Sequence, residues 1–477
     1  MASTYVNDLR LNEMATGDGS GTWGTTTNTN LELIAEAFGS GSEALSDAST
    51  GTITMADGAS DAARAMALTL TGSLSQACTV TLAPNTVNKC WVIKNSAGDT
   101  VTISQGTGSN VVIPNGSIKM IVTDGAGSGA AVTDVLAMTS GAGNVGLGNG
   151  ALGTGITTAT DNVAVGDSAG DALTTGSDNT FIGDNAGGAT TTGSNNTAVG
   201  SASLLANTTA VRNTALGHAA GTAITTGDNN VAVGYNAMAT NTVGDRNIAV
   251  GAGALSTYNP GSNEDSHNIA IGFDALKATT TGKQNTAIGG LSLDANTTAD
   301  NNTAIGYAAL GANTTGASNT AVGVESLDAN TTASDNSAFG RRSLSANTTG
   351  ASNTAVGLEA MYANTTGAQN VAVGSNALDA NTTAGNNTAI GYSSMGANTT
   401  GTSNAGLGAF SLNDNTTGSQ NTAVGQNALE ANTTADNNTA VGFQAMYTNT
   451  TGTANAALGT YALDANTTGD SNTAIGY

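Results

Sequence analysis

The sequence predicts an all-β protein in which a long parallel β-roll, or β-solenoid, makes up most of the chain. Three observations predict it: a strict 17-residue repeat, a Gly at one fixed position of that repeat, and no apolar pattern of period 3.6. We expect three regions. Residues 1–43 form a short segment with one helix, 44–140 a small antiparallel β-sandwich, and 141–477 the solenoid.

The repeat begins at an Asn, here position 0, and reads in one copy as Asn302 to Ser318. The twenty anchors lie at 144, 162, 179, 196, 213, 230, 247, 268, 285, 302, 319, 336, 353, 370, 387, 404, 421, 438, 455 and 472. Two spacings differ from seventeen, and the last copy is cut after six residues. A short fixed period over such a length indicates stacked coils that each contact only their neighbours.

Each repeat is expected to hold two short strands separated by a corner at position +4, which is Gly in every copy. Position +3 is always apolar and +1 is mostly β-branched, so both point to one side of the strand. We predict that +1, +3 and the Leu or Met at +8 face inward. The Ala at +2 would leave a bare outer face. Asn302 and Asn313 are expected to form amide ladders between stacked coils.

The interior predicted in this way is thin, which suggests more than one chain. Ordering a residue costs roughly 1–2 kcal/mol, whereas each buried apolar side chain contributes about 1.5–3 kcal/mol. We therefore expect a homotrimer whose copies pack against the bare Ala face. The alternative is a solenoid of one chain.

The first region is expected to contain a helix from Asn30 to Phe38, with Asn30 as N-cap and Gly39 as the stop. The glycines around Trp23 indicate a loop. Such a helix is too short to stand alone, so it should dock on the next domain or on a partner protein.

The second region alternates apolar and polar residues in short runs separated by turn signals, which is typical of a small antiparallel sandwich. The expected strands are Thr52–Met55, Met66–Leu70, Thr79–Leu82, Trp91–Lys94, Thr100–Ser104, Val111–Ile113, Ile118–Thr123 and Val132–Met138. Trp91 is expected in its core. Cys78 and Cys90 could pair or could be buried free thiols.

Three stretches resemble known families. Residues 7–18, then 21–25 and 28–34, resemble the start of tail-fibre proteins of marine tailed phages, and residues 70–95 resemble a small β domain of such fibres. The repeat Asn-Thr-Ala-Val-Gly…Ala-Leu is similar to that of trimeric autotransporter adhesin heads, where three chains each form a left-handed parallel β-roll.

These resemblances imply that the N-terminus joins the virion, with Asn7, Asp8, Leu9, Arg10 and Trp23 as the attachment residues. The 17-residue repeat is longer than the usual adhesin repeat, and we see no signal peptide, coiled-coil stalk or membrane barrel. That favours the phage family. The chain stops inside a repeat, so we expect either a separate tip protein or a truncated chain.

Composition excludes several functions. The net charge is −23 with 11 Lys and Arg residues and no basic stripe, so nucleic-acid binding and attraction to anionic membranes are not expected. The sequence has no run of 18 apolar residues, so a membrane-spanning helix is not expected. His218 and His267 lie far apart, and the acidic residues at +9 are too sparse for a metal row or a glycosidase pair. We expect no enzyme activity and no cofactor.

Positions +5 and +6 vary most, and they follow the Gly corner. The Arg341-Arg342 doublet is the only basic pair in the repeats, and we consider it a candidate contact with a host receptor. Repeated Asn-Thr-Thr triplets would also fit an ice-binding surface. The leading hypothesis is a homotrimeric phage tail fibre located in the virion tail. Its partners would be other tail proteins, a tip protein and a host-surface receptor. The alternatives are a bacterial surface adhesin and a ligand- or ice-binding solenoid.

Overall fold

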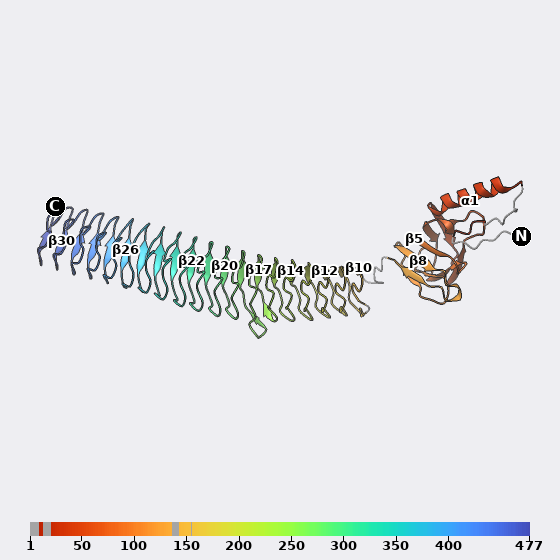
Figure 1. Ribbon diagram of the computed structural model, residues 1–477, viewed down its shortest axis with the longest axis horizontal. Coiled ribbons are helices and arrows are strands. Elements are labelled where there is room, and N and C mark those ends of the chain that lie inside the picture. Colours follow the sequence, from red (N-terminus) through yellow and green to blue (C-terminus); the bar gives the residue numbers. More distant parts are fainter. Residues whose placement is uncertain (1–8, 13–20, 136–142, 154) are drawn as a thin grey trace. The chain divides into compact units, whose positions relative to one another are not determined.

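The computed structural model describes residues 9–12, 21–135, 143–153 and 155–477. The chain divides into two compact units, 1–147 and 148–477. Figure 1 shows a small mixed unit and a long stack of narrow coils. Within the described residues the protein is all-β except for one α-helix and two short 3-10 turns.

The helix is longer than predicted. It runs from Trp23 to Ala37, so Trp23 begins the helix instead of lying in a loop, and Asn30 is in its middle. Leu33 and Ala37 are its buried residues, whereas Leu31 and Phe38 are exposed. Asn30 clamps the preceding segment, because its side chain accepts from the Asn12 N–H and donates to the Asn12 carbonyl, both at 3.2 Å.

Two sheets form the rest of the N-terminal unit, and most neighbouring strands within a sheet are not consecutive in the sequence. Their elements are β1 (Ser40–Leu45), β2 (Thr50–Thr54), η1 (Ala62–Arg64), β3 (Ala67–Gly72), β4 (Cys78–Ala83), β5 (Asn88–Ser96), β6 (Val101–Ser104), β7 (Val111–Ile113), β8 (Ile118–Asp124), η2 (Gly127–Gly129) and β9 (Val132–Asp134). The sheet orders are β1-β3-β5-β8-β9 and β2-β4-β6-β7. Both sheets share one core, in which Trp91 is 2% exposed, as predicted.

The antiparallel prediction for this unit is wrong for half of it. Strands β1, β3 and β5 pair in parallel, as do β2, β4 and β6; only β7, β8 and β9 pair antiparallel. From β1 to β6 the chain crosses from one sheet to the other between successive strands, so neighbours among these strands run in the same direction. Alternation of side chains is the same in both arrangements and could not distinguish them. Cys78 and Cys90 are both free thiols.

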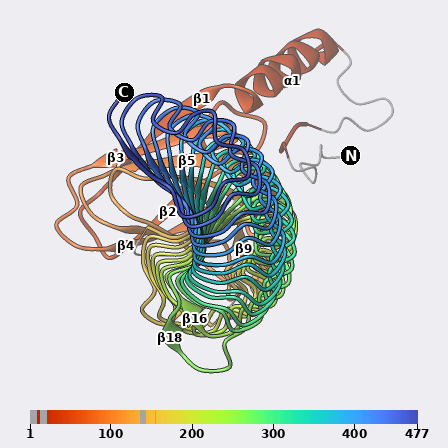
Figure 2. The same ribbon diagram turned by 90° about the vertical axis from the view of Figure 1, so that its left-hand side faces the viewer.

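The solenoid sheet has twenty strands in sequence order, all three residues long. They are β10 (Val145–Leu147), β11 (Val163–Val165), β12 (Thr180–Ile182), β13 (Thr197–Val199), β14 (Thr214–Leu216), β15 (Val231–Val233), β17 (Ile248–Val250), β19 (Ile269–Ile271), β20 (Thr286–Ile288), β21 (Thr303–Ile305), β22 (Thr320–Val322), β23 (Ser337–Phe339), β24 (Thr354–Val356), β25 (Val371–Val373), β26 (Thr388–Ile390), β27 (Ala405–Leu407), β28 (Thr422–Val424), β29 (Thr439–Val441), β30 (Ala456–Leu458) and β31 (Thr473–Ile475). The pairing is parallel and in register, with Thr303 opposite Thr320 in the next coil. Figure 2 looks along this stack and shows successive coils rotating progressively.

The coils turn at Gly and at residues with left-handed backbone. Gly306 at position +4 has φ 141°, and a Cβ there would lie 2.4 Å from the carbonyl oxygen of Gly323 in the next coil. The predicted Gly corner is confirmed, but the predicted second strand after it is wrong, because in the described coils the residues that follow the Gly form turns. Left-handed conformation also occurs at −1, +6 and +8, as at Asn301, Ala308 and Leu310. Sequence reasoning missed these corners, because non-Gly residues rarely adopt them.

The predicted orientation of the strand is wrong. Ala304 at +2 is fully buried inside its own coil, whereas Ile305 at +3 is 38% exposed and Thr303 at +1 is half-buried. The same orientation holds throughout the described coils. The coil closes to an interior that admits Ala at +2 and +7 and one Leu or Met at +8. The branched side chains at +1 and +3 therefore face outward, and no bare Ala face exists for sister chains.

A large residue at +2 is accompanied by small residues at +8 in the same coil and the preceding one, so the volume of the core is conserved. Phe181 is the one large residue at +2, and Gly170 and Gly187 are two of the three that replace Leu at +8. A Cβ at Gly170 would lie 2.7 Å from the Phe181 ring, and one at Gly187 would lie 2.5 Å from it. One aromatic ring thus fills the volume that two missing leucines leave in adjacent coils.

Two amide ladders run along the interior, as predicted. Asn302 Nδ2 donates to the carbonyl of Gly316 at 2.9 Å, and its Oδ1 accepts the backbone N–H of Asn319 at 2.9 Å. Asn313 Nδ2 donates to Oδ1 of Asn296 in the preceding coil at 3.1 Å. These bonds satisfy buried amides that would otherwise be costly.

One coil carries an insertion, where β16 (Gly244–Asp245) pairs in parallel with β18 (Glu264–Asp265). Tyr258 replaces Asn at +11 in this coil and is fully buried. Burial is the main cause that raises the pKa of Tyr258 to about 12, and the nearby carboxylates of Glu264, Asp300 and Asp245 contribute in the same direction.

Candidate functional site

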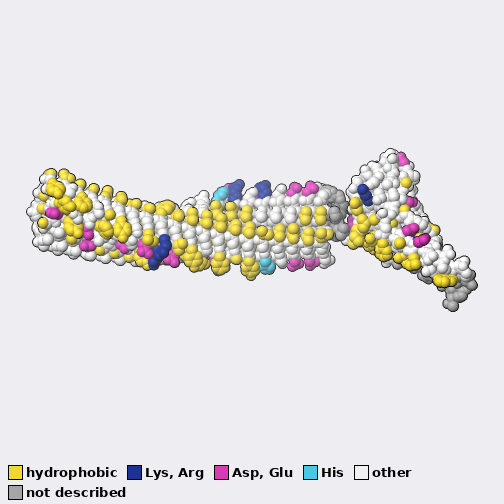
Figure 3. All heavy atoms as spheres, turned by 90° about the horizontal axis from the view of Figure 1, so that it is seen from above, with side chains coloured by type: hydrophobic (Ala, Val, Ile, Leu, Met, Phe, Trp, Pro, Cys, Tyr) yellow, Lys and Arg dark blue, Asp and Glu magenta, His cyan; other side chains and the backbone are white. Residues whose placement is uncertain are grey.

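The outward side chains at +1 and +3 form a continuous band, here called the apolar stripe, along the twenty-stranded sheet. Position +3 is Val, Ile, Leu or Phe in every coil, and neither position carries a charged residue. Exposed fractions at +3 include 38% for Ile305, 43% for Phe339 and 40% for Ile390. Figure 3 shows hydrophobic side chains aligned in lengthwise bands on the solenoid. A band of this length far exceeds an isolated surface residue and marks an interaction surface.

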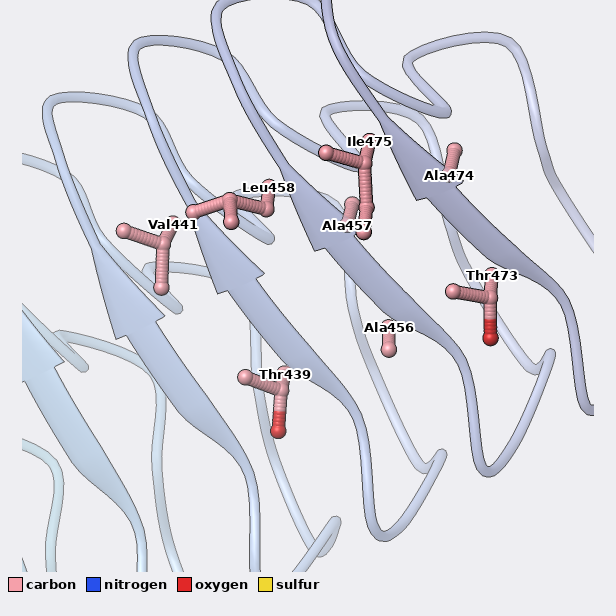
Figure 4. Close-up of a pocket in the computed structure, with 8 residues that line it drawn as sticks. All are labelled: Thr439, Val441, Ala456, Ala457, Leu458, Thr473, Ala474 and Ile475. Atoms are coloured by element: carbon pink, nitrogen blue, oxygen red, sulfur yellow. The ribbon is translucent and has the colours of Figure 1, made fainter.

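A hollow near the last coils belongs to this stripe (Figure 4). Strands β29, β30 and β31 line it, and Ala456 at +1 stands between Thr439 and Thr473. The lining holds only aliphatic side chains and two Thr hydroxyls, with no titratable group. The hollow therefore offers packing volume and no acid–base chemistry.

The corner after the strand carries a second exposed row at position +5, one residue past the Gly that turns the chain off the sheet. Its aromatic members include Tyr235 and Phe273, each 60% exposed, and Tyr307 and Tyr392, each 54% exposed. The ring of His218 stacks on Tyr235 with centroids 5.5 Å apart. Sequence reasoning identified this position as variable and exposed but did not weigh its aromatic content.

The predicted basic doublet is not a free positive patch. Arg342 lies between Glu325 and Glu359, at 3.6 Å and 3.2 Å, and its guanidinium stacks over Tyr362 at 4.6 Å. Arg341 is more exposed and lies 3.9 Å from Glu359. Glu325, Arg342 and Glu359 all occupy +6 at intervals of seventeen, so the repeat itself carried the signal for this ladder.

Of the predicted virion-attachment residues, Asn7 and Asp8 lie outside the described residues. Leu9 and Arg10 are held against the N-terminal unit. Buried Arg64 donates to the Leu9 carbonyl, and Arg10 Nε donates to Asp57 at 2.6 Å. Trp23 is 67% exposed at the start of α1.

Helix α1 presents an apolar outer side. Trp23, Leu31 and Phe38 at its end are 67%, 59% and 75% exposed. Leu33 and Ala37 pack on one side of the helix, as its predicted docking requires, while none of the described residues covers the other side.

Among the described residues no group of three or more His, Cys, Asp or Glu side chains could hold a metal ion. Burial raises the pKa of Asp294 and of Asp379, both at +9. Burial also lowers the pKa of Lys89 to about 8, but its ammonium donates to the carbonyls of Ala63 and Ala65, which is a structural role.

Comparison with family models, with characterised proteins and with solved structures gives no match to this chain. In the part of the chain that the structure describes, no helix is both long and apolar enough to cross a bilayer.

Proposed function

We propose that this chain is a structural and adhesive protein, a homotrimeric phage tail fibre whose repeats form a rigid shaft. Residues 1–43 would attach to the virion, residues 44–140 would form a collar, and the shaft would project a recognition tip toward the host. The observation that carries the proposal is the uncharged apolar stripe along the whole length of a hydrogen-bonded solenoid. The work of such a protein is spacing and multivalent attachment.

Rigidity is supported by the interior. Strand, corner and ladder hydrogen bonds join each coil to both of its neighbours. The Thr303 N–H donates to the Asn319 carbonyl of the next coil at 2.8 Å, and the Gly306 N–H donates to the Ile288 carbonyl of the preceding coil at 2.8 Å. The threonine at +12 adds another, since Thr314 Oγ1 donates to the Thr331 carbonyl at 3.0 Å. A shaft whose coils are all hydrogen-bonded to their neighbours is expected to be stiff along its length.

Self-association is supported by the apolar stripe. The sequence suggested that sister chains pack against an Ala face, but that face is buried inside each coil. The chain has a net charge of −23, yet positions +1 and +3 carry none of it. A partner that covers the stripe must be apolar over the same length, and a second and third copy in register meet that requirement because the stripe repeats with every coil. The three stripes would face one another along the trimer axis.

Attachment at the N-terminus is supported by α1. Its outer side exposes Trp23, Leu31 and Phe38, and aromatic residues of this kind commonly anchor protein interfaces. The partner would be another tail protein with an apolar groove for one helix.

Two other candidates use the same geometry. A bacterial surface adhesin would present an identical shaft from a cell. An ice-binding solenoid is favoured by the exposed Thr row at +13, as at Thr315, although the adjacent Thr row at +12 already bonds to backbone. A thermal-hysteresis assay of the purified chain tests the ice-binding candidate.

The deciding experiment is electron microscopy of phage particles labelled with antibody to this chain. Labelled tail fibres support the proposal, and label confined to bacterial cell surfaces supports the adhesin. Sedimentation of the full chain tests assembly separately. We expect a trimer that Ile305→Asp with Ile390→Asp dissociates, while Thr315→Asp with Thr400→Asp, exposed but off the stripe, leaves it intact. A folded monomer for the unaltered chain would reject the trimer.

A further inference from the structure

Large and small side chains alternate along part of the row at position +5, and the packing of the coils does not explain this alternation. Over five consecutive coils it reads Tyr235, Ala252, Phe273, Gly290 and Tyr307. Large aromatic rings thus stand on every second coil, and the coils between them carry the smallest side chains. Each ring is at least 54% exposed, more than the 37–38% of Ile271, Ile288 and Ile305 on the neighbouring stripe.

Backbone hydrogen bonds keep this row in register. The carbonyls of Tyr235, Ala252, Phe273 and Gly290 each accept an N–H from the following coil, at 3.0, 3.0, 2.9 and 3.0 Å. Adjacent coils are therefore one strand spacing apart along the row. Two coils place successive rings roughly 9–10 Å apart.

The small residues leave room beside each ring. A Cβ at Gly290 would be in ordinary contact with the Tyr307 ring, 3.8 Å from its Cδ2, so no bulk separates the rings. At one end of the row the ring of His218 stacks on Tyr235, with centroids 5.5 Å apart, and fixes the position of that ring. Polar groups directly follow two rings: Asn236 after Tyr235, and Asp274 after Phe273, with Lys277 Nζ 2.8 Å from Asp274.

From this geometry we infer that the row Tyr235–Phe273–Tyr307 is a binding platform for an extended, uncharged β-linked polysaccharide. Aromatic faces stack on the apolar faces of pyranose rings, and flanking polar groups bond to hydroxyls. In a two-fold extended glycan, every second sugar presents the same face to one side. The interval between those sugars is one disaccharide, which matches two coils.

The charge of the chain selects the ligand class further. A net charge of −23 disfavours polyanions, and the coils before the row carry Asp167 and Asp184 at the same position. The ligand is therefore not an anionic glycan, and the +5 row from 235 to 307 holds no carboxylate that would bind a cationic one. The inference rests on the proposed attachment role of the shaft and deepens it by naming a receptor chemistry. The platform lies past the Gly corner, outside the stripe that the trimer would cover.

The test uses the full-length protein and affinity electrophoresis in gels containing hydroxyethyl cellulose, an uncharged extended β-glucan, or soluble starch, a coiled α-glucan. We expect retardation by the first and not by the second. Replacing the three rings together (Tyr235→Ala, Phe273→Ala and Tyr307→Ala) should abolish retardation, because each stacked ring contributes roughly two- to tenfold in affinity. No retardation by the β-glucan, or equal retardation of this variant, overturns the inference.

Two further variants test the spacing. The matched control, Tyr392→Ala with Phe443→Ala, removes exposed +5 rings that instead pack edge-on against Phe410 and Tyr461 in the next coil, and it should bind normally. Gly290→Tyr with Tyr307→Ala keeps three rings but moves one by a coil. Weakened binding of this variant supports the two-coil register, and full binding overturns it.

These outcomes separate from those of the fibre proposal. If tail fibres are labelled but the protein does not bind the glycan, the fibre proposal is supported and the binding platform is rejected. Glycan binding without labelled fibres would leave the platform on an adhesin.

Discussion

The two units of this protein both place parallel strands in register, yet they stabilise them by different means. In the N-terminal unit, strands β1 to β6 alternate between two sheets, and the two sheets enclose a core of large side chains, including Trp91, Leu70 and Ile103. In the solenoid the strands of one sheet enclose little more than Ala304 and Leu310 per coil. Buried Asn ladders and close Gly corners replace the missing apolar volume there.

This difference indicates which substitutions should destabilise each unit. A core of large side chains is sensitive to lost volume, whereas a narrow coil is sensitive to added volume and to lost hydrogen bonds. The following predictions test that division, starting with the largest expected effect.

Trp91→Ala should lower the free energy of unfolding of the N-terminal unit by about 3–5 kcal/mol, since it empties the core and leaves the Ala63 carbonyl without its 2.9 Å donor. The solenoid transition should not move, because each coil depends on its neighbours. Denaturant titration followed by circular dichroism and by Trp fluorescence measures both transitions, since both Trp residues lie in the first unit. Trp23→Ala, at an exposed site, is the control. Parallel shifts of both transitions would contradict the division.

Gly323→Ala should destabilise the solenoid by about 3 kcal/mol, because φ is 141° there and the new Cβ would lie 2.4 Å from the Gly340 carbonyl oxygen. Gly290→Ala adds the same methyl group where the nearest atom is 3.8 Å away, and it should change stability by less than about 0.5 kcal/mol. Thermal unfolding by circular dichroism compares the two. Equal effects would show that the corner does not need Gly.

Asn319→Ala should cost about 2 kcal/mol, because the buried Asn336 N–H loses its 3.0 Å acceptor and the Ala333 carbonyl keeps only the Asn330 side chain as an amide donor. Thr315→Ala, on the exposed +13 row, is the matched surface control and should be near neutral. Hydrogen exchange of the Asn336 amide gives a local readout. Unchanged protection in the Asn319 variant would remove the ladder as a source of stability.

Tyr258 should produce a small alkaline effect. Its folded pKa is raised from 10.0 to about 12, so its contribution to stability is fully present below pH 10 and declines as pH rises toward 12. Absorbance titration of phenolate should reveal one group near pH 12 that Tyr258→Phe eliminates. If the variant keeps that step, the insertion does not bury the phenol.

Much of the solenoid could be predicted because its signals are local and repeat. Gly at +4 and Asn at 0 recur in the sequence, and the structure assigns both the expected roles, a corner and a ladder. The ladder of Glu325, Arg342 and Glu359 was equally readable at intervals of seventeen but was not sought. The start of α1 at Trp23 was missed because four glycines nearby indicated a loop.

The sequence by itself determined the period, the corner and the alternation of side chains along each strand. Only the tertiary structure decided which side of that alternation is the interior. Alternation has two phases that differ by one residue, and both satisfy the pattern equally. The width of the closed coil selects the phase in which Ala304 is enclosed and Ile305 is left outside.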